Sequence, residues 1–186
     1  MKHRTLIFCL LATAGMPTAA EEIDDALRGL LRAAVEESES FADRFEAEVW
    51  LTDMSNRLAR RMPDAAERIE LLRLIHQEAT RAELPPELVL AVIEVESGFD
   101  RFAVSVAGAR GLMQIMPFWL HEIGRPDDNL MHAQTNLRMG CTILKYYLDM
   151  EKGDLRKALA RYNGSAGKRK YPDKVFKALS ERWYRS

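Results

Sequence analysis

The chain has 186 residues, 47% of them hydrophobic and 30% charged, and a formal net charge of −1. This length can bury one good core with a smaller helical appendage, and the composition is that of an ordinary globular protein. A net charge so close to zero excludes binding to nucleic acid through overall basicity, so no nucleic-acid partner is expected.

The first twenty residues have the pattern of a secretory signal peptide. A basic start precedes a short apolar run at 6–15, and small residues stand before an expected cut near Glu21. The run is too short to span a bilayer permanently, although a retained N-terminal anchor is the alternative. Cys9 follows Phe8 rather than a small residue, which argues against a lipoprotein. The sequence therefore predicts removal of residues 1–20 and a periplasmic location.

Helical spacing of apolar residues dominates the rest of the chain. In chain order it predicts helices over residues 23–35, 49–62, 64–79, 86–96, 134–151 and 154–162, and a basic helix after the break at 163–167. A short helix is also expected from Leu112, with Pro117 at its start, bend or end. Because no alternating strand pattern or internal repeat is found, we predict an all-α fold. It divides into a helical N-terminal extension, 21–66, and a main domain, 67–186.

The helix predicted over 86–96 is expected to lie in the core. Proline in its first turn costs no hydrogen bond, its residues are apolar on nearly every side, and Gly98 suits its end. Glu96 is expected to lie against these apolar side chains, whereas Glu94 is expected on a wetter side with Glu87. A carboxyl held against apolar side chains loses hydration when ionised, so the pKa of Glu96 should rise. Such an acid can donate a proton near neutral pH.

On residue chemistry alone, a glutamate that makes a local hydrogen bond at the helix end is the favoured interpretation of Glu96. Four spaced blocks favour a catalytic role instead: 96–100 (ESGFD), 103–109, 111–117 (GLMQIMP) and 160–164 (ARYNG). Together they resemble the soluble lytic transglycosylase family, the goose-lysozyme-like enzymes that cleave peptidoglycan, over roughly residues 68–180. The resemblance implies a lysozyme-like all-α fold with the substrate groove between helical lobes, and it implies that Glu96 is catalytic.

A lytic transglycosylase, as the resemblance implies, needs one carboxyl where most glycosidases need two. Glu96 would protonate the oxygen of the β-1,4 bond between N-acetylmuramic acid and N-acetylglucosamine. Once ionised, it would take a proton from the C6 hydroxyl of the muramic acid, which closes on C1 and gives a 1,6-anhydro product. No cofactor or metal is required, and the four histidines lack the spacing of a zinc site. Cys141, the only cysteine after the signal, is expected in the core.

Five further residues are carried over from the resemblance as candidate substrate-binding residues. Ser105 matches a serine near the catalytic acid and the sugar, although satisfying the loop backbone is an equal alternative. Gln114, a polar residue in an apolar block, matches a groove residue that hydrogen-bonds the sugar, and Met116 is expected to line the groove. Tyr162 matches a tyrosine that can hydrogen-bond the catalytic carboxyl and hold its rotamer, and Asn163 completes the tyrosine–asparagine pair.

Three positions depart from the family pattern. Arg101 stands where proline is usual, Gly164-Ser165 replaces alanine-glycine, and Trp119 stands where threonine is usual. The indole of Trp119 is large enough to fill part of a sugar subsite or to stack on a sugar. These departures affect the subsites rather than the reaction class.

Several alternatives stay open. A muramidase that uses water needs a second carboxylate across the groove, for which Asp100 is the nearest candidate in sequence. A non-catalytic peptidoglycan-binding or scaffolding protein would keep the groove without the chemistry. A specialised enzyme of a secretion apparatus or pilus would use the acidic helices of the extension to bind a cell-wall-associated partner. A monomer is expected, and the basic stretch 156–185 is either a solvated helix face or a contact for the carboxylates of peptidoglycan.

Overall fold

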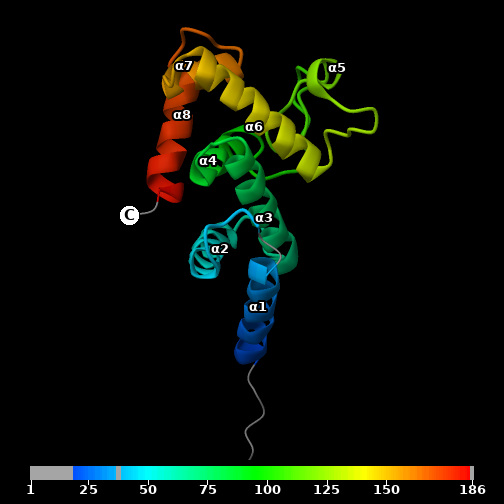
Figure 1. Ribbon diagram of the computed structural model, residues 1–186, viewed down its shortest axis with the longest axis vertical. Coiled ribbons are helices and arrows are strands. Elements are labelled where there is room, and N and C mark those ends of the chain that lie inside the picture. The colour runs from blue at the N-terminus through cyan, green and yellow to red at the C-terminus, as the bar shows by residue number, and fades with distance from the viewer. Residues whose placement is uncertain (1–18, 37–38, 185–186) are drawn as a thin grey trace, which may run out of the picture.

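The computed structural model describes residues 19–36 and 39–184, and within these ranges its regular secondary structure is entirely helical. The elements in chain order are α1 (Ala19–Glu36), α2 (Arg44–Leu58), α3 (Ala65–Arg81), α4 (Pro86–Glu96), α5 (Trp119–Ile123), α6 (Ala133–Met150), α7 (Leu155–Tyr162), α8 (Lys170–Ala178) and the π-helix η1 (Leu179–Trp183). The predicted all-α fold is confirmed. Figure 1 shows α1 at one end of an elongated molecule and α6 and α7 toward the other.

The expected signal peptide lies outside the described residues, except that its last two positions begin α1. Cys9, on which the expectation about lipid attachment depends, lies outside them as well. Both expectations about export therefore stay predictions.

Local sequence signals explain most of the helix boundaries. Asp43, Asp64 and Asp154 cap α2, α3 and α7, and each accepts a hydrogen bond from the backbone N–H three residues later at 2.8 to 3.1 Å. Pro86 begins α4, where a missing N–H leaves no bond unmade. The predicted end of α4 at Glu96 is confirmed.

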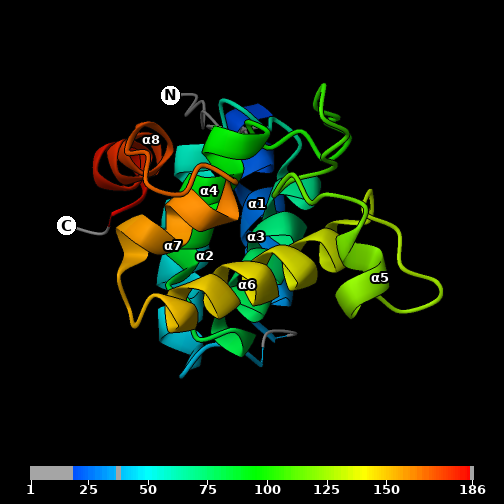
Figure 2. The same ribbon diagram turned by 90° about the horizontal axis from the view of Figure 1, so that it is seen from above.

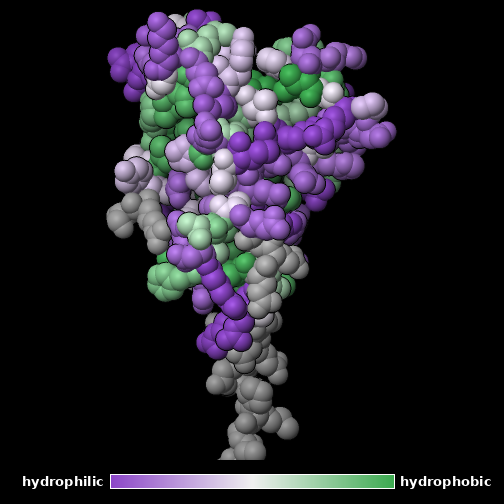
Figure 3. Space-filling view, in the orientation of Figure 1, coloured by the Kyte–Doolittle hydropathy of each residue, from purple (hydrophilic) through white to green (hydrophobic). Residues whose placement is uncertain are grey.

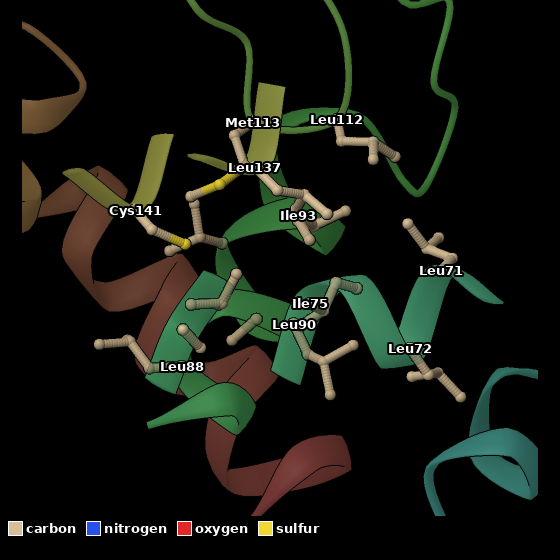
Figure 4. Close-up of a cluster of buried hydrophobic side chains, with 14 of the residues drawn as sticks. Leu71, Leu72, Ile75, Leu88, Leu90, Ile93, Leu112, Met113, Leu137 and Cys141 are labelled. Atoms are coloured by element: carbon tan, nitrogen blue, oxygen red, sulfur yellow. The ribbon is translucent and has the colours of Figure 1, made fainter. Parts of the chain in front are cut away.

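The core lies where α3, α4 and α6 pack together. Figure 4 shows side chains of these helices meeting, with two side chains of the loop after α4 beside them. The residues of α4 from Leu88 to Ile93 are all buried, which explains why this helix is apolar on nearly every side. Cys141 lies in this core as expected, and burial raises the pKa of its thiol to about 12, so it stays protonated.

The helices of the extension pack directly onto the main domain. Figures 1 and 2 show α1 beside α2 and α3, and these three helices contact one another. The ring of Phe41 stacks on His76 at 3.5 Å, and the indole of Trp50 donates a hydrogen bond to Glu87 of α4 at 2.8 Å. Burial lowers the pKa of His76 to about 4, so this contact is made by a neutral imidazole near pH 7.

Glu94 corrects one expectation, because its side chain is only 6% exposed and does not lie on a wet face. Its Oε1 accepts a hydrogen bond from Arg61 at 2.6 Å, and its Oε2 accepts from Arg182 at 2.8 Å and from the indole of Trp183 at 2.7 Å. The C-terminal segment folds back over this face of α4, which helical periodicity cannot reveal. Glu94 thus joins α4 to the turn after α2 and to η1.

The prediction of a short helix from Leu112 is wrong. Residues 111–114 form a turn in which Gln114 adopts the left-handed region at φ 50°, and α5 begins only after Pro117. Arg110 forms isolated antiparallel β-bridges with Val104 and with Ile115. These two bridges fold the loop between α4 and α5 into a compact unit.

The side chain of Asn136 in α6 stabilises the turn at 111–114 through hydrogen bonds. Its buried amide accepts a hydrogen bond from Met113 N at 2.8 Å and donates to the carbonyls of Arg110 and Leu130 at 2.8 and 2.9 Å. Gly111 lies against it at φ 75°, and a Cβ there would lie 2.4 Å from Asn136 Nδ2 and 2.6 Å from the Leu130 carbonyl oxygen. The turn therefore requires a residue without a side chain at this point.

Gly111→Ala is expected to lower the free energy of unfolding by about 2–4 kcal/mol, because left-handed strain and a clash with buried backbone add together. Gly153→Ala is the matched control, since Gly153 also has a positive φ, of 86°, but a Cβ there would meet nothing within 4 Å. The control should lose only about 1 kcal/mol. Urea unfolding of the two variants measures the difference, and equal losses would show that the contact with Asn136 is unimportant.

Candidate active site

A cleft of about 280 Å³ opens at the C-terminal end of α4. The segment between α7 and α8 and the first turns of α8 form its other walls, and Figures 1 and 2 show α8 beside α4. Its lining side chains are mostly polar or basic: Val95, Glu96, Asn163, Ser165, Lys168, Lys170, Tyr171 and Lys174. Glu96 is the only acidic residue among them.

The carboxyl of Glu96 is largely desolvated. Burial raises its pKa from the ordinary 4.5 to about 7, while a hydrogen bond from Tyr171 and the ammonium of Lys174 act in the opposite direction. The Tyr171 hydroxyl donates to Glu96 Oε1 at 2.7 Å. Because burial and the nearby carboxylate raise the pKa of Tyr171 well above 10, this hydroxyl keeps its proton and can serve as a donor. The predicted rise in the pKa of Glu96 is thus found.

Tyr162 lies close to this carboxyl but does not make the hydrogen bond expected of it. Its hydroxyl donates to the Met113 carbonyl oxygen at 2.8 Å, which ties the end of α7 to the loop after α4. Burial first, and then the charge of Glu96, raise the pKa of Tyr162 well above 10. The tyrosine that holds the carboxyl is Tyr171, nine residues further along the chain.

Ser105 and Gln114 serve the loop backbone in this structure. The Ser105 hydroxyl accepts a hydrogen bond from Ala109 N at 3.0 Å, which is the backbone role weighed from the sequence. The Gln114 amide donates to the carbonyls of Ala103 and Gly111 at 3.2 and 2.9 Å. Neither side chain is part of the lining of the cleft with Glu96.

The remaining candidates divide between the cleft and its surroundings. Asn163 follows α7 directly and lines the cleft with Glu96. Met116 is half-buried outside this lining, and its carbonyl accepts from the backbone N–H of Trp119 at 3.1 Å. Trp119 begins α5 and packs against Phe118, with ring centroids 5.1 Å apart, so it does not reach this cleft.

Sequence reasoning missed Tyr171 and the role of Ser97. Tyr171 stands in a stretch of lysines, and its only signal was a large aromatic residue among charged ones. Ser97 follows the acid directly, and its hydroxyl donates to the Leu112 carbonyl at 2.8 Å, which fixes the end of α4 against the following loop. A serine placed directly after a helix end signals such a local bond.

The arrangement can donate a proton to a bond held in the cleft and later take one back. Asp100, the candidate for a second carboxylate, is exposed outside the lining and accepts a hydrogen bond from Phe102 N at 2.8 Å. Within residues 19–36 and 39–184, no group of three or more potential metal-ligating side chains is found. None of the helices in these ranges is long and apolar enough to cross a membrane.

Tyr171→Phe is expected to move the titration midpoint of Glu96 to higher pH, because the lost hydrogen bond stabilises the ionised carboxyl. NMR titration of the side-chain carboxyl measures the midpoint directly. Tyr162→Phe is the control, since its hydroxyl bonds a backbone carbonyl instead. A larger shift in the control than in Tyr171→Phe would contradict the assignment of the hydrogen-bond donor.

Comparison with known proteins gives a family. The family model described as "Transglycosylase SLT domain" matches residues 73–182, more than half of the chain. A transglycosylase of Enterobacteria phage PRD1 is 33% identical over 104 residues, which is 52% of this chain and 38% of the relative. Membrane-bound lytic murein transglycosylase C of Yersinia pestis (strain Pestoides F) is 30% identical over 112 residues, 52% of this chain and 31% of the relative. The chain thus spans well under half the length of these curated relatives.

Two solved structures are similar at lower identity. An inactive mutant of the lytic transglycosylase Slt from Pseudomonas aeruginosa has 22% identity and a TM-score of 0.48, covering 86% of this chain and 30% of its own. The 70 kDa soluble lytic transglycosylase from Escherichia coli has 20% identity and a TM-score of 0.47, covering 85% and 27%. The resemblance drawn from the sequence blocks is confirmed by the family match: the chain belongs to the Transglycosylase SLT domain family.

Proposed function

We propose that this protein is a peptidoglycan lytic transglycosylase. It cleaves the β-1,4 bond between N-acetylmuramic acid and N-acetylglucosamine and leaves a 1,6-anhydro-muramoyl product. The observation that carries the proposal is a carboxyl, Glu96, whose pKa burial raises to about 7 while it lines an open cleft. Membership of the family and the activities for which the relatives are named support the reaction class.

Glu96 acts twice in the proposed reaction. The neutral acid gives its proton to the glycosidic oxygen as the bond to C1 of the muramic acid breaks, so the N-acetylglucosamine leaves with a hydroxyl. The carboxylate then removes the proton from the C6 hydroxyl of the same muramic acid, and the C6 oxygen closes on C1. The nucleophile belongs to the substrate, so no water must be positioned and the catalyst ends protonated as it began.

The neighbours of Glu96 support this cycle. Tyr171 donates a hydrogen bond that strengthens when the carboxyl is ionised, so it stabilises the form that acts as the base. Asn163 lies in the same cleft and offers an amide to a hydroxyl or N-acetyl group of the sugar. Ser105, Gln114, Met116 and Tyr162 lie outside this lining and stay proposed substrate contacts for parts of the glycan beyond the cleft.

Two rival functions are weaker on the same geometry. A muramidase that uses water would need a second carboxylate near Glu96, and Asp100 lies outside the cleft lining. A non-catalytic glycan-binding protein has no need of a desolvated acid, which is costly to keep when ionised.

The setting of the activity is proposed on the same basis. Peptidoglycan lies outside the cytoplasm, and removal of residues 1–20 during export to the periplasm would bring the protein to it. The protein would act there as a non-lipidated monomer, without metal or cofactor. Residues 67–186 would carry the activity. The acidic extension, 21–66, would add a surface for a cell-wall-associated protein, beyond its own packing on α3 and α4.

Incubation of purified sacculi with the protein should release anhydro-muropeptides, detected by mass spectrometry, and Glu96→Gln should release none. The amide keeps an acceptor for Tyr171 but has no proton to give. Glu122→Gln is the control, because Glu122 is exposed on α5 outside the cleft, and it should retain full activity. Muropeptides with a reducing end would decide for the muramidase, and equal release by the parent and Glu96→Gln would sink the role of this residue.

The pH dependence follows from the raised pKa of Glu96. The first step needs the neutral acid, so kcat/KM is expected to fall as pH rises through about 7. The pKa of Glu96 in the folded protein exceeds the ordinary 4.5 of the unfolded chain. Protonation of Glu96 therefore contributes stability that is fully present below pH 4.5 and is lost as pH rises through about 7. Glu96→Gln should therefore become more stable than the parent above neutral pH, by up to about 3 kcal/mol. Unfolding at several pH values measures this independently of activity.

A further inference from the structure

Three lysines line the cleft beside the proposed proton donor. Lys168, Lys170 and Lys174 are exposed, line the cleft with Glu96, and form no salt bridge among the described residues. Two other basic residues of this region are paired: Arg156 bonds Asp173 and Arg161 bonds Glu151. Figure 3 shows the end of the molecule around α7 as predominantly hydrophilic.

The charge of the cleft is therefore positive. Burial raises the pKa of its one acidic residue, Glu96, to about 7, and three lysine ammonium groups line the same cleft. Like charges gathered around one concave surface repel each other, and a bound anion relieves this repulsion. A solvated helix face would place its lysines around a convex surface instead. The cleft is thus suited to an anionic group of the ligand.

The chemistry of the substrate supplies such a group close to the reacting bond. The muramic acid whose C1 bond is cleaved carries a lactyl ether at C3 of the same ring, and the peptide stem with its free carboxylates extends from it. A proton donor at the glycosidic oxygen therefore has the root of the stem beside it. Flexible lysines reach carboxylates at variable positions better than a rigid guanidinium does.

We propose that Lys168, Lys170 and Lys174 bind carboxylates of the peptide stem on the muramic acid that is cleaved. They make the protein select glycan strands that still carry peptides over naked strands. The inference rests on the proposed function, since it assumes that peptidoglycan occupies this cleft. It assigns the basic stretch of α8 to substrate selection and not to solubility alone.

Binding is tested in a Glu96→Gln background, which prevents cleavage. Purified peptide-bearing strands, and the same strands stripped of peptides by an amidase, are titrated into this protein and into the triple variant Lys168→Gln, Lys170→Gln, Lys174→Gln. The triple variant should lose about tenfold in affinity for peptide-bearing strands, as expected for three exposed charge contacts, and little for naked strands. Raised salt should weaken the binding of peptide-bearing strands and leave the binding of naked strands unchanged.

A control variant removes the same total charge away from the cleft. It combines three exposed basic positions: Arg60→Gln, Arg125→Gln and Lys152→Gln. An equal loss in this control would overturn the proposal, as would an unchanged preference in the first triple variant. Displacement of the strands by inorganic polyphosphate as readily as by free stem peptide would also overturn it, because the cleft would then bind any polyanion.

Failure of the proposed cleavage and failure of the proposed lysine contacts give different results. A parent protein that binds peptide-bearing strands through these lysines, yet releases no anhydro-muropeptides from sacculi, would refute the cleavage and leave the binding preference intact. Thermal unfolding of both triple variants verifies that they are folded, which is expected since all the replaced side chains lie on the surface.

Discussion

The desolvation of one carboxyl is the interaction on which this structure depends. Glu96 ends a helix whose residues from Leu88 to Ile93 are all buried, and burial of its own carboxyl raises the pKa to about 7. Hydration would return that pKa toward 4.5 and leave a carboxylate with no proton to give. The apolar character of α4 therefore sets the chemistry of its last residue as well as the stability of the core.

Two carboxyls on α4 show how much the surroundings decide. Glu94 accepts hydrogen bonds from Arg61, Arg182 and Trp183, so its charge is compensated and it serves as an anchor between segments. Glu96 accepts one hydrogen bond from a neutral phenol, and the ammonium of Lys174 also acts on its charge. The carboxyl of Glu94 joins segments of the fold, and the carboxyl of Glu96 has a pKa near neutral pH, where it can act as an acid or as a base.

The sequence predicted what local signals determine. The prolines, the apolar run and the glycine after Glu96 placed α4 and its end, and the aspartates at the starts of α2, α3 and α7 are caps that sequence alone can suggest. What failed depends on distant contacts. The turn at 111–114 is imposed by Asn136 of α6, and the partner of Glu96 is supplied by α8, 75 positions further along the chain. No periodicity within a segment carries that information.

The C-terminal segment bears on how the cleft is held together. α8 supplies Tyr171, it continues without a break into η1, and η1 is fastened to α4 through Glu94. The acid and its hydroxyl partner thus lie on helices that are joined to each other at two points. The short connection between α7 and α8 forms another wall of the cleft, and Gly164 and Gly167 there adopt positive φ angles with open space around them. The bonds that fasten η1 to α4 therefore also fix the position of the hydroxyl that bonds the acid.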